Sequence, residues 1–347
     1  MERRREIYFL DGVPQVGTRY YGIVDQGTNV VEVRPTSLCP LNCVFCSVAA
    51  GPLEGRRWAD FTVKKDALVD ALKAVVRYKG DGVEVHIDGM GEPAVYSDLV
   101  DLVQDVKSIR GVSVVSMQSR MFTLTERNVE ELAEAGLDRI NLSLDAVDPP
   151  LAARLANAGY YDPRRAMALA EYAVRNTSID VVVSPVWLPG VNDDQMPKIA
   201  RWAKAAGLGK RWPPVLIQKY IPHRRGRNPR GVKAVDWGAF WSRIRAWEAQ
   251  LGMKLDWRGE NPFGVERRAE LPKPIKAGQR IKVRIVGRGV FRNEYLAVPN
   301  RLADDPLVDR AVTVISEKPL KPGDEAVVKV FEDEDNILMA RAEVVFL

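Results

Sequence analysis

The stretch Cys39-Pro40-Leu41-Asn42-Cys43-Val44-Phe45-Cys46 holds all three cysteines of the 347-residue chain, with the spacing C-x3-C-x2-C. It comes shortly after a β-branched run, Val30-Val31-Glu32-Val33, which predicts a strand. A disulfide framework needs an even number of cysteines spread along a secreted chain. Three cysteines gathered behind one strand therefore indicate a bound metal group rather than a covalent crosslink.

Three thiolates fit a [4Fe–4S] cluster that keeps one iron open. Cubane clusters take cysteine thiolates, normally four, and an iron without a protein ligand can bind a small chelating molecule, like the open position of a catalytic metal site. Zinc is the alternative, and it needs a fourth Cys or His. The two histidines of the chain, His86 and His223, are distant from the triad in sequence. Three unrelated core cysteines are the remaining interpretation.

Around this stretch the sequence alternates short β-branched runs with amphipathic segments. We expect strands over 30–33, 83–87, 112–115, 140–144, 179–184 and 215–217, and helices over 64–78, 98–107, 126–135, 164–175 and 196–206. Short connections between such elements favour a parallel sheet with right-handed crossovers. Six units are too few for a closed eight-unit barrel. We therefore predict an α/β fold, a partial (β/α)6 barrel with its chemistry at the C-terminal ends of the strands.

The C-terminal part of the chain has a different pattern. After a helix over 237–251, short strands are expected over 280–286, 294–298, 311–315, 325–330 and 340–346, separated by turn residues such as Pro322-Gly323. Five short strands predict a small all-β barrel of the OB type. The expected domains are an N-terminal extension (1–29), the partial barrel (30–228), a helix and linker (229–273) and the OB-like domain (274–347).

Charge and hydropathy limit the partners and the compartment. The chain carries 51 Lys and Arg against 46 Asp and Glu, a net charge of +5 that permits an anionic partner without requiring one. The basic N-terminus is not followed by the apolar segment of a secretory signal. No apolar run has the 18 or so residues that a membrane helix needs. We expect a cytoplasmic protein with no membrane partner.

The cysteine triad, with Phe45 before its last member, resembles the signature of radical S-adenosylmethionine (SAM) enzymes. The resemblance implies a [4Fe–4S] cluster on Cys39, Cys43 and Cys46 that cleaves SAM, and a reducing electron donor such as ferredoxin or flavodoxin. The segment Gly89-Met90-Gly91-Glu92 resembles the glycine-rich segment that holds the amino group of SAM in this family. Glycines let backbone carbonyls approach an ammonium group closely, and the acid adds charge complementarity.

Three further segments extend the resemblance over roughly residues 30–220. Ser119 continues the match after the third strand, Ser143 lies in a segment that contacts the SAM carboxylate or ribose in the family, and Asn192 lies in a loop near the adenine. Arg154 is either a partner for the SAM carboxylate or a solvated helix residue. Arg120 departs from the family, whose members often have Asn there. It is expected to meet a phosphate of the substrate or the SAM carboxylate, or else to be a structural ion-pair partner.

The cysteine count narrows the chemistry further. Relatives that insert sulfur use an auxiliary cluster, and relatives that methylate ribosomal RNA use an additional cysteine. Neither has a thiolate available here. What remains is abstraction of a hydrogen atom, followed by rearrangement, coupling or another alkyl transfer.

The substrate is expected to be RNA, with tRNA favoured. Residues 275–347 resemble a TRAM domain, an RNA-binding module. Arg280, Lys282 and Arg284 alternate along one strand face near two aromatic residues, a combination typical of single-strand nucleic-acid binding. The alternative is a solvated strand face, because this region has 12 cations and 12 acids. A basic loop adds Arg224, Arg225 and Arg227 at the end of the sixth strand.

Two other functions compete with this one. A radical SAM enzyme with the same chemistry can act on a protein, a lipid or a small molecule, with the C-terminal barrel as a docking module. A non-enzymatic protein that binds RNA and is stabilised by a metal or a cluster is the second alternative. Such a protein would not need the glycine-rich segment or Ser143.

Overall fold

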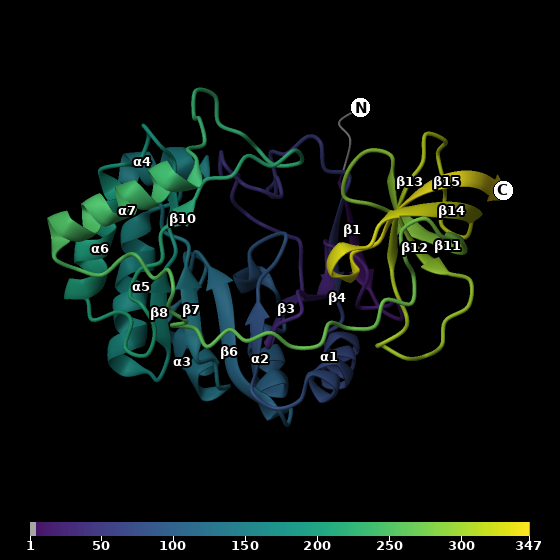
Figure 1. Ribbon diagram of the computed structural model, residues 1–347, viewed down its shortest axis with the longest axis horizontal. Helices are drawn as coiled ribbons and strands as arrows, with labels where there is room; N and C mark the ends of the chain where they lie inside the picture. Colours follow the sequence, from purple (N-terminus) through teal and green to yellow (C-terminus); the bar gives the residue numbers. More distant parts are fainter. Residues whose placement is uncertain (1–4, 347) are drawn as a thin grey trace. The chain divides into compact units, whose positions relative to one another are not determined.

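The structure, a computed structural model, describes residues 5–346 (Figure 1). Residues 1–4 of the expected N-terminal extension and Leu347 of the expected C-terminal domain lie outside the described residues. The chain divides into two compact units. The first comprises Met1–Leu38, Glu54–Val114 and Glu266–Leu347, and the second comprises Cys39–Leu53 and Val115–Val265. These units group the chain differently from the four sequence-based domains, whose boundaries stay a prediction.

The first unit contributes three strands of an α/β layer. β3 (Val30–Arg34) pairs in parallel with β5 (Val83–Ile87), and β2 (Gly22–Asp25) pairs with β3 in antiparallel orientation. Alternate residues of β3 are fully buried, whereas Glu32 and Arg34 are half-buried, which is the period-two pattern of a strand. The other elements of this part are β1 (Glu6–Leu10), which is parallel to β4 (Ala59–Val63), and the helices α1 (Lys65–Lys79) and α2 (Leu99–Ser108).

The C-terminal part of the first unit is a closed five-stranded barrel in the order β11-β12-β13-β15-β14. β13 and β15 are parallel, and the other neighbours are antiparallel, which is the connectivity of an OB-type barrel. Small and β-branched side chains such as Val283, Val314 and Val328 fill its core. The bounds are β11 (Arg280–Arg288), β12 (Glu294–Pro299), β13 (Val312–Ile315), β14 (Glu325–Glu332) and β15 (Met339–Phe346).

The residues before β2 pack on this barrel and form an integral part of it. The amide of Ala311 donates to the Val16 carbonyl (2.8 Å), and the amide of Leu338 donates to the Gly17 carbonyl (2.7 Å). A Cβ atom at Gly17 would lie 2.1 Å from the Ala311 carbonyl oxygen, so only glycine permits this approach. The sequence analysis assigned no strand before Val30, and the structure adds β1 and β2 there.

The second unit contains the remaining parallel strands and most helices. β6 (Val112–Ser119) begins in the first unit and continues into the second, where it pairs in parallel with β7 (Arg139–Leu142), which pairs with β8 (Asp180–Val183). Thr125 caps α3 through a reciprocal capping box with Asn128. The helices are α3 (Glu126–Glu134), α4 (Pro149–Ala156), α5 (Pro163–Asn176), α6 (Gln195–Ala205) and α7 (Trp237–Leu251).

The expected sixth strand over 215–217 is wrong. Val215 forms only an isolated bridge with Val183, and the nearest strand is the two-residue β10 (Gln218–Lys219), parallel to β9 (Val186–Trp187). The Val183 amide donates to the Pro214 carbonyl (2.9 Å) and the Leu216 amide donates to the Val183 carbonyl (2.8 Å). The next donor in the facing segment would be residue 185, a proline, which has no amide hydrogen to continue the ladder. The parallel strands, their helices and the separate all-β barrel nevertheless confirm the predicted fold class. Among residues 5–346, no helix is long and apolar enough to cross a membrane.

Candidate functional site

The cysteine loop lies in the second unit and is anchored to the end of α4. The amide of Asn42 donates to the Ala156 carbonyl (3.0 Å), and the amide of Val44 donates to the Leu155 carbonyl (2.9 Å). The last carbonyls of a helix have no hydrogen-bond donor within the helix, so these bonds satisfy the carbonyls of α4 as well as the amides of the loop. Apolar side chains of the loop pack against α4 as well. The conformation of the loop is therefore set by a helix that lies more than a hundred residues away in sequence.

The three thiols differ in exposure and are free of disulfides. Cys43 is buried, whereas Cys39 and Cys46 are partly accessible. Burial raises the pKa of the Cys43 thiol to about 11, although the positive charge of Arg120 acts in the opposite direction. The Cys46 sulfur accepts a hydrogen bond from the Ala50 amide (3.4 Å). A buried thiol of this kind binds iron as the thiolate, so cluster binding must displace its proton.

The donor set fits a cluster better than a single zinc ion. Within residues 5–346, no three His, Cys, Asp or Glu side chains converge closely enough to hold one metal ion. A zinc site requires its ligands to converge on one point, whereas a cubane binds each thiolate through a different iron. Three thiols without disulfides on one anchored loop can supply a thiolate to each of three irons. Cys39, Cys43 and Cys46 are the residues that would hold the cluster.

A second anchor comes from Arg227, which sequence analysis assigned to RNA. Its backbone amide donates to the Cys46 carbonyl (2.8 Å), its Nε donates to the Cys43 carbonyl (2.7 Å) and its Nη2 donates to the Ala50 carbonyl (2.6 Å). A Cβ atom at Gly226 would lie 2.7 Å from the Cys46 carbonyl oxygen, so the two loops touch through their backbones. In the structure Arg227 is thus a positioning residue of the cysteine loop.

Arg120 and Asp145 form a buried ion pair beside the cysteine loop. The Arg120 Nη2 donates to the Asp145 carboxylate (2.6 Å), and the guanidinium lies 5.6 Å from the centre of the Tyr161 ring. The other oxygen of Asp145 accepts from the Val186 amide (2.9 Å). Of the roles expected for Arg120, the structure shows the ion pair. Its positive charge acts to lower the pKa of the Cys43 thiol.

The glycine-rich segment lies in the first unit, against the residues that lead into Cys39. A Cβ atom at Gly91 would lie 2.1 Å from the Leu38 carbonyl oxygen, and one at Gly89 would lie 2.8 Å from the Thr36 carbonyl oxygen. The amide of Glu92 donates to Leu38 (2.8 Å). Close backbone approach, rather than an unusual φ angle, requires glycine at these positions.

A buried arginine that sequence analysis missed supports this segment. The Arg57 side chain is completely buried and donates to the carbonyls of Met90 (3.3 Å) and Ser37 (3.2 Å). It also forms an ion pair with the buried Asp60, which accepts from the Ser37 hydroxyl (3.0 Å). Arginines are mostly exposed, so the residue type gives no reason to expect a buried side chain here. The one signal in the sequence is that Arg57 and Asp60 are three residues apart.

The other predicted cofactor residues are mostly engaged in local structure. Glu92 is buried and caps a short turn by accepting from the Ala94 amide (3.3 Å). The Ser119 hydroxyl accepts from the Met121 amide (2.9 Å), and the Ser143 hydroxyl accepts from Gln118 Nε2 (2.6 Å).

Arg154 is exposed on α4, and Phe45 packs half-buried beside the cysteines.

Asn192 crosslinks its own loop. Its Oδ1 accepts from the Leu188 amide (2.7 Å), and its Nδ2 donates to the carbonyls of Asp145 and Val186 (3.0 Å each). The side chain is completely buried. Asn192 therefore joins the loop after β9 to the segment that carries Asp145. A direct contact between Asn192 and SAM stays a prediction.

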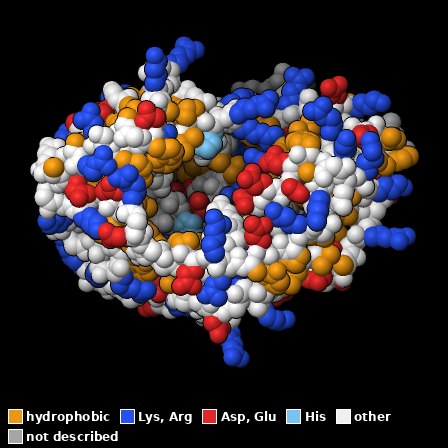
Figure 2. Space-filling model, viewed as in Figure 1, with side chains coloured by type: hydrophobic (Ala, Val, Ile, Leu, Met, Phe, Trp, Pro, Cys, Tyr) orange, Lys and Arg blue, Asp and Glu red, His pale blue; other side chains and the backbone are white. Residues whose placement is uncertain are grey.

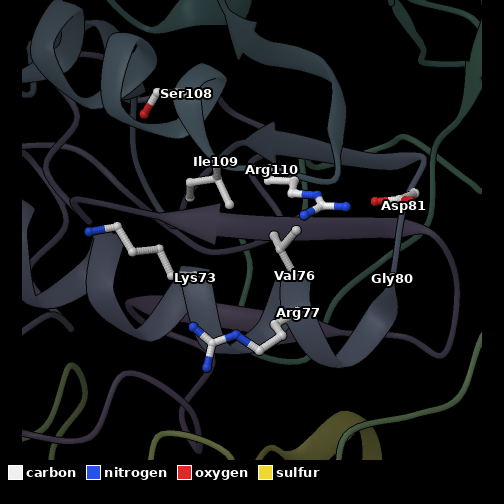
Figure 3. Close-up of a pocket in the computed structure, with 8 residues that line it drawn as sticks. All are labelled: Lys73, Val76, Arg77, Gly80, Asp81, Ser108, Ile109 and Arg110. Carbon is white, nitrogen blue, oxygen red and sulfur yellow. The ribbon is translucent and has the colours of Figure 1, made fainter.

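A cavity of about 570 Å³ lies elsewhere in the first unit, at the C-terminal end of α1 (Figure 3). Figure 3 shows that Lys73 and Arg77 extend away from Arg110 and Asp81 rather than toward a common point. None of the predicted site residues lines this cavity. These side chains therefore offer an anion no common point of contact in this cavity.

We expect Arg227→Gln to loosen the cysteine loop, because two charge-assisted hydrogen bonds to its carbonyls are lost, each worth about 1.5–3 kcal/mol. The variant should retain less iron after anaerobic reconstitution and lose it faster in air, as measured by iron content and visible absorbance. Arg230→Gln, which removes an exposed arginine of the same loop, is the matched control. Equal iron content in the two variants would contradict the positioning role.

We expect Gly91→Ala to displace the glycine-rich segment from Leu38 and to weaken SAM binding. Forcing a methyl group into packed backbone costs about 1–3 kcal/mol, so the midpoint of urea unfolding should also fall. Gly55→Ala is the control in the same unit, because a Cβ atom there meets nothing within 4 Å. Equilibrium dialysis with labelled SAM measures the binding, and parental affinity in Gly91→Ala would show that the segment is not part of the SAM site.

Comparison with known proteins places the site in a family. The Radical SAM superfamily matches residues 33–203. An uncharacterized protein of Methanocaldococcus jannaschii, MJ0103, is 31% identical over 97% of this chain and 81% of its own length. A GTP 3′,8-cyclase of Paenarthrobacter nicotinovorans is 30% identical over 55% of this chain, and the match spans 53% of that enzyme, about half its length.

Solved structures show the same fold at low sequence identity. Streptococcus suis SuiB bound to S-adenosylmethionine superimposes with a TM-score of 0.52 and 18% identity, over 65% of this chain and 49% of SuiB. Matches at this level of identity show only a shared fold. The family match and the relative aligned along nearly the whole chain carry the assignment. The chain belongs to the Radical SAM superfamily, whose members use a [4Fe–4S] cluster and S-adenosylmethionine.

Proposed function

We propose that this radical SAM enzyme modifies a nucleotide within RNA, with tRNA as the favoured substrate. Cluster and SAM together supply a carbon-centred radical that abstracts a hydrogen atom. The chain's own residues hold the cysteine loop, bind SAM and place the RNA. Cysteines without disulfides and an iron–sulfur site suit a reducing cytoplasm, and we propose a ferredoxin or flavodoxin as electron donor.

The observation that carries the proposal is the basic loop attached to the cysteine loop. Residues 223–230 touch the cysteine loop through Gly226 and Arg227. The same loop exposes His223, Arg224 and Arg230. A group of cations fixed beside the catalytic loop attracts a polyanion and raises its local concentration there. A phosphate backbone is a polyanion of this kind.

The C-terminal barrel is the second support. OB-type barrels commonly bind oligonucleotides and oligosaccharides. In this chain the barrel carries the strand with Arg280, Lys282 and Arg284, which are all exposed. Two of them have carboxylate partners: Arg280 bonds to Glu343 (2.6 Å), and Lys282 lies 3.6 Å from Glu325. Such exposed ion pairs are weak, and RNA phosphates can replace them.

A small nucleotide is the second candidate substrate, and the relatives favour it. The matched cyclases act on GTP, as their name states. The basic loop that would attract RNA would also attract a triphosphate. The C-terminal barrel then has no evident role in catalysis, which is why we favour RNA.

We expect RNA to stimulate SAM cleavage by the anaerobically reconstituted, reduced protein. Unmodified tRNA transcripts should increase 5′-deoxyadenosine formation and yield a nucleoside of altered mass, because the abstracted hydrogen leaves a changed base or ribose. Chromatography and nucleoside mass spectrometry measure the two products. Cys43→Ala should lack both. Consumption of GTP without any change in RNA would support the second candidate instead.

We expect the double variant Arg224→Gln/Arg230→Gln to bind tRNA more weakly. The slope of the logarithm of the binding constant against the logarithm of the salt concentration should also become shallower, by about 0.7–0.9 for each lost phosphate contact. Arg201→Gln/Lys204→Gln is the matched control, since it removes two exposed cations from α6 in the same unit. Filter binding at several salt concentrations measures both. The same loss in both variants would show that general charge, rather than this loop, attracts RNA.

A further inference from the structure

The surface that OB-type barrels commonly use for nucleic acids is covered in this protein. That surface consists of the second and third strands and the loops that follow the first and fourth strands. Here the corresponding strands are β12 and β13, in which nearly every residue is buried. The Tyr20 hydroxyl donates to Glu294 of β12 (2.6 Å), and Tyr20 itself is almost completely buried.

The two loops at this surface are also occupied by the chain itself. In the loop after β11, the Val290 carbonyl accepts from the Trp58 amide (2.6 Å), and Phe291 forms a bridge with Arg57. At the loop after β14, Leu338 donates to Gly17. All of these contacts lie within the first unit. An RNA strand therefore cannot use this surface without displacing the N-terminal segment from the barrel.

The opposite side of the barrel, formed by β11, β14 and β15, is open and basic. Strand register places Arg280, Lys329 and Arg341 directly opposite one another across the three strands. Like charges in opposite positions destabilise a sheet, and a bound polyanion would relieve that cost. Five cations and two carboxylates lie on this outer face: Arg280, Lys282, Arg284, Lys329, Arg341, Glu325 and Glu343.

Exposed aromatic rings accompany these cations. Phe331 and Phe346 are 48% and 47% exposed. The Lys282 ammonium lies 5.1 Å from the centre of the Phe346 ring. Within the described residues, Arg284, Lys329 and Arg341 form no close ion pair, and the Glu343 carboxylate that pairs with Arg280 also interacts with the charge of Lys329. Figure 2 shows Lys and Arg side chains projecting from the right-hand edge of the barrel, with hydrophobic side chains beside them. Aromatic rings that stack on bases, between cations that contact phosphates, form a surface for single strands.

We propose that the outer face of β11, β14 and β15 binds single-stranded RNA. Phosphates contact the row Arg280, Lys329 and Arg341, and bases stack on Phe331 and Phe346. This inference rests on the proposed function, because it assumes an RNA substrate. It assigns the binding to the side of the barrel opposite the usual one, for the physical reason that the N-terminal segment covers the usual surface.

The test uses surface variants of the full-length protein, since removing the barrel would expose the partners of Tyr20 and Gly17. Lys329→Gln/Arg341→Gln and Phe331→Ser/Phe346→Ser should each bind a fluorescent single-stranded RNA about tenfold more weakly. The cation variant should also have a shallower salt dependence. Arg301→Gln/Lys318→Gln removes the same charge from exposed loops and is the control, with an expected change below about twofold. Thermal unfolding confirms that every variant is folded.

The outcomes separate this inference from the proposed function. If both face variants bind RNA as tightly as the parent and still modify RNA, the proposed binding face is wrong and the proposed function stands. Equal affinity of the parent for a duplex of the same sequence would also overturn it, because paired bases cannot stack on the rings. A parent that binds no RNA at all would overturn both. Weaker binding of single-stranded RNA by the two face variants, but not by the control, supports the proposed binding face.

Discussion

The hydrogen bonds that hold the cysteine loop at both of its sides are the constraint on which the site depends. One side is bound to the last carbonyls of α4, and the other is bound to Arg227. Three thiolates within a span of eight residues leave the loop few conformations that can serve three different irons. Preorganising that conformation removes an entropic cost from cluster binding. The buried ion pair of Arg120 and Asp145 lies near Cys43, and of its two opposing charges the positive charge of Arg120 has the larger effect on the Cys43 thiol.

The first unit is built from three separate segments of the chain, and this has consequences for its stability. The N-terminal segment is bound to the C-terminal barrel through Gly17 and Tyr20, whereas the core of the barrel is filled by the barrel's own side chains. Contacts between residues that are hundreds of positions apart close large loops and are slow to form. The segment that completes the barrel also covers the usual nucleic-acid surface, so the open cationic face lies on the other side.

Much of the fold was predictable because hydrophobic patterns are local. The strands β3, β5, β7 and β8 and the capping box of α3 follow from β-branched runs and from Thr125 with Asn128. The segment after Pro214 has the same apolar pattern, yet Pro185 in the facing segment lacks the donor that a continuous sixth ladder needs. β1 was missed with its partner β4, which no local pattern reveals, and β2 was missed because it has only four residues, although it pairs with the predicted β3. The five strands of the C-terminal barrel were predicted almost to their ends, since turn residues separate them.

For the site, the sequence by itself determined the cysteine spacing and the glycines, and with them the family and its cofactors. These features are local, because a cluster and a close backbone contact each require particular residues within a few positions. Only the tertiary structure decided what the arginines do. Arg227 binds a loop 184 residues earlier in the chain, Arg120 pairs with Asp145, and Arg57 is completely buried. The local sequence around a charged side chain does not reveal whether its partner is a carbonyl, a carboxylate or a phosphate. Its partner is chosen by the packing of distant segments.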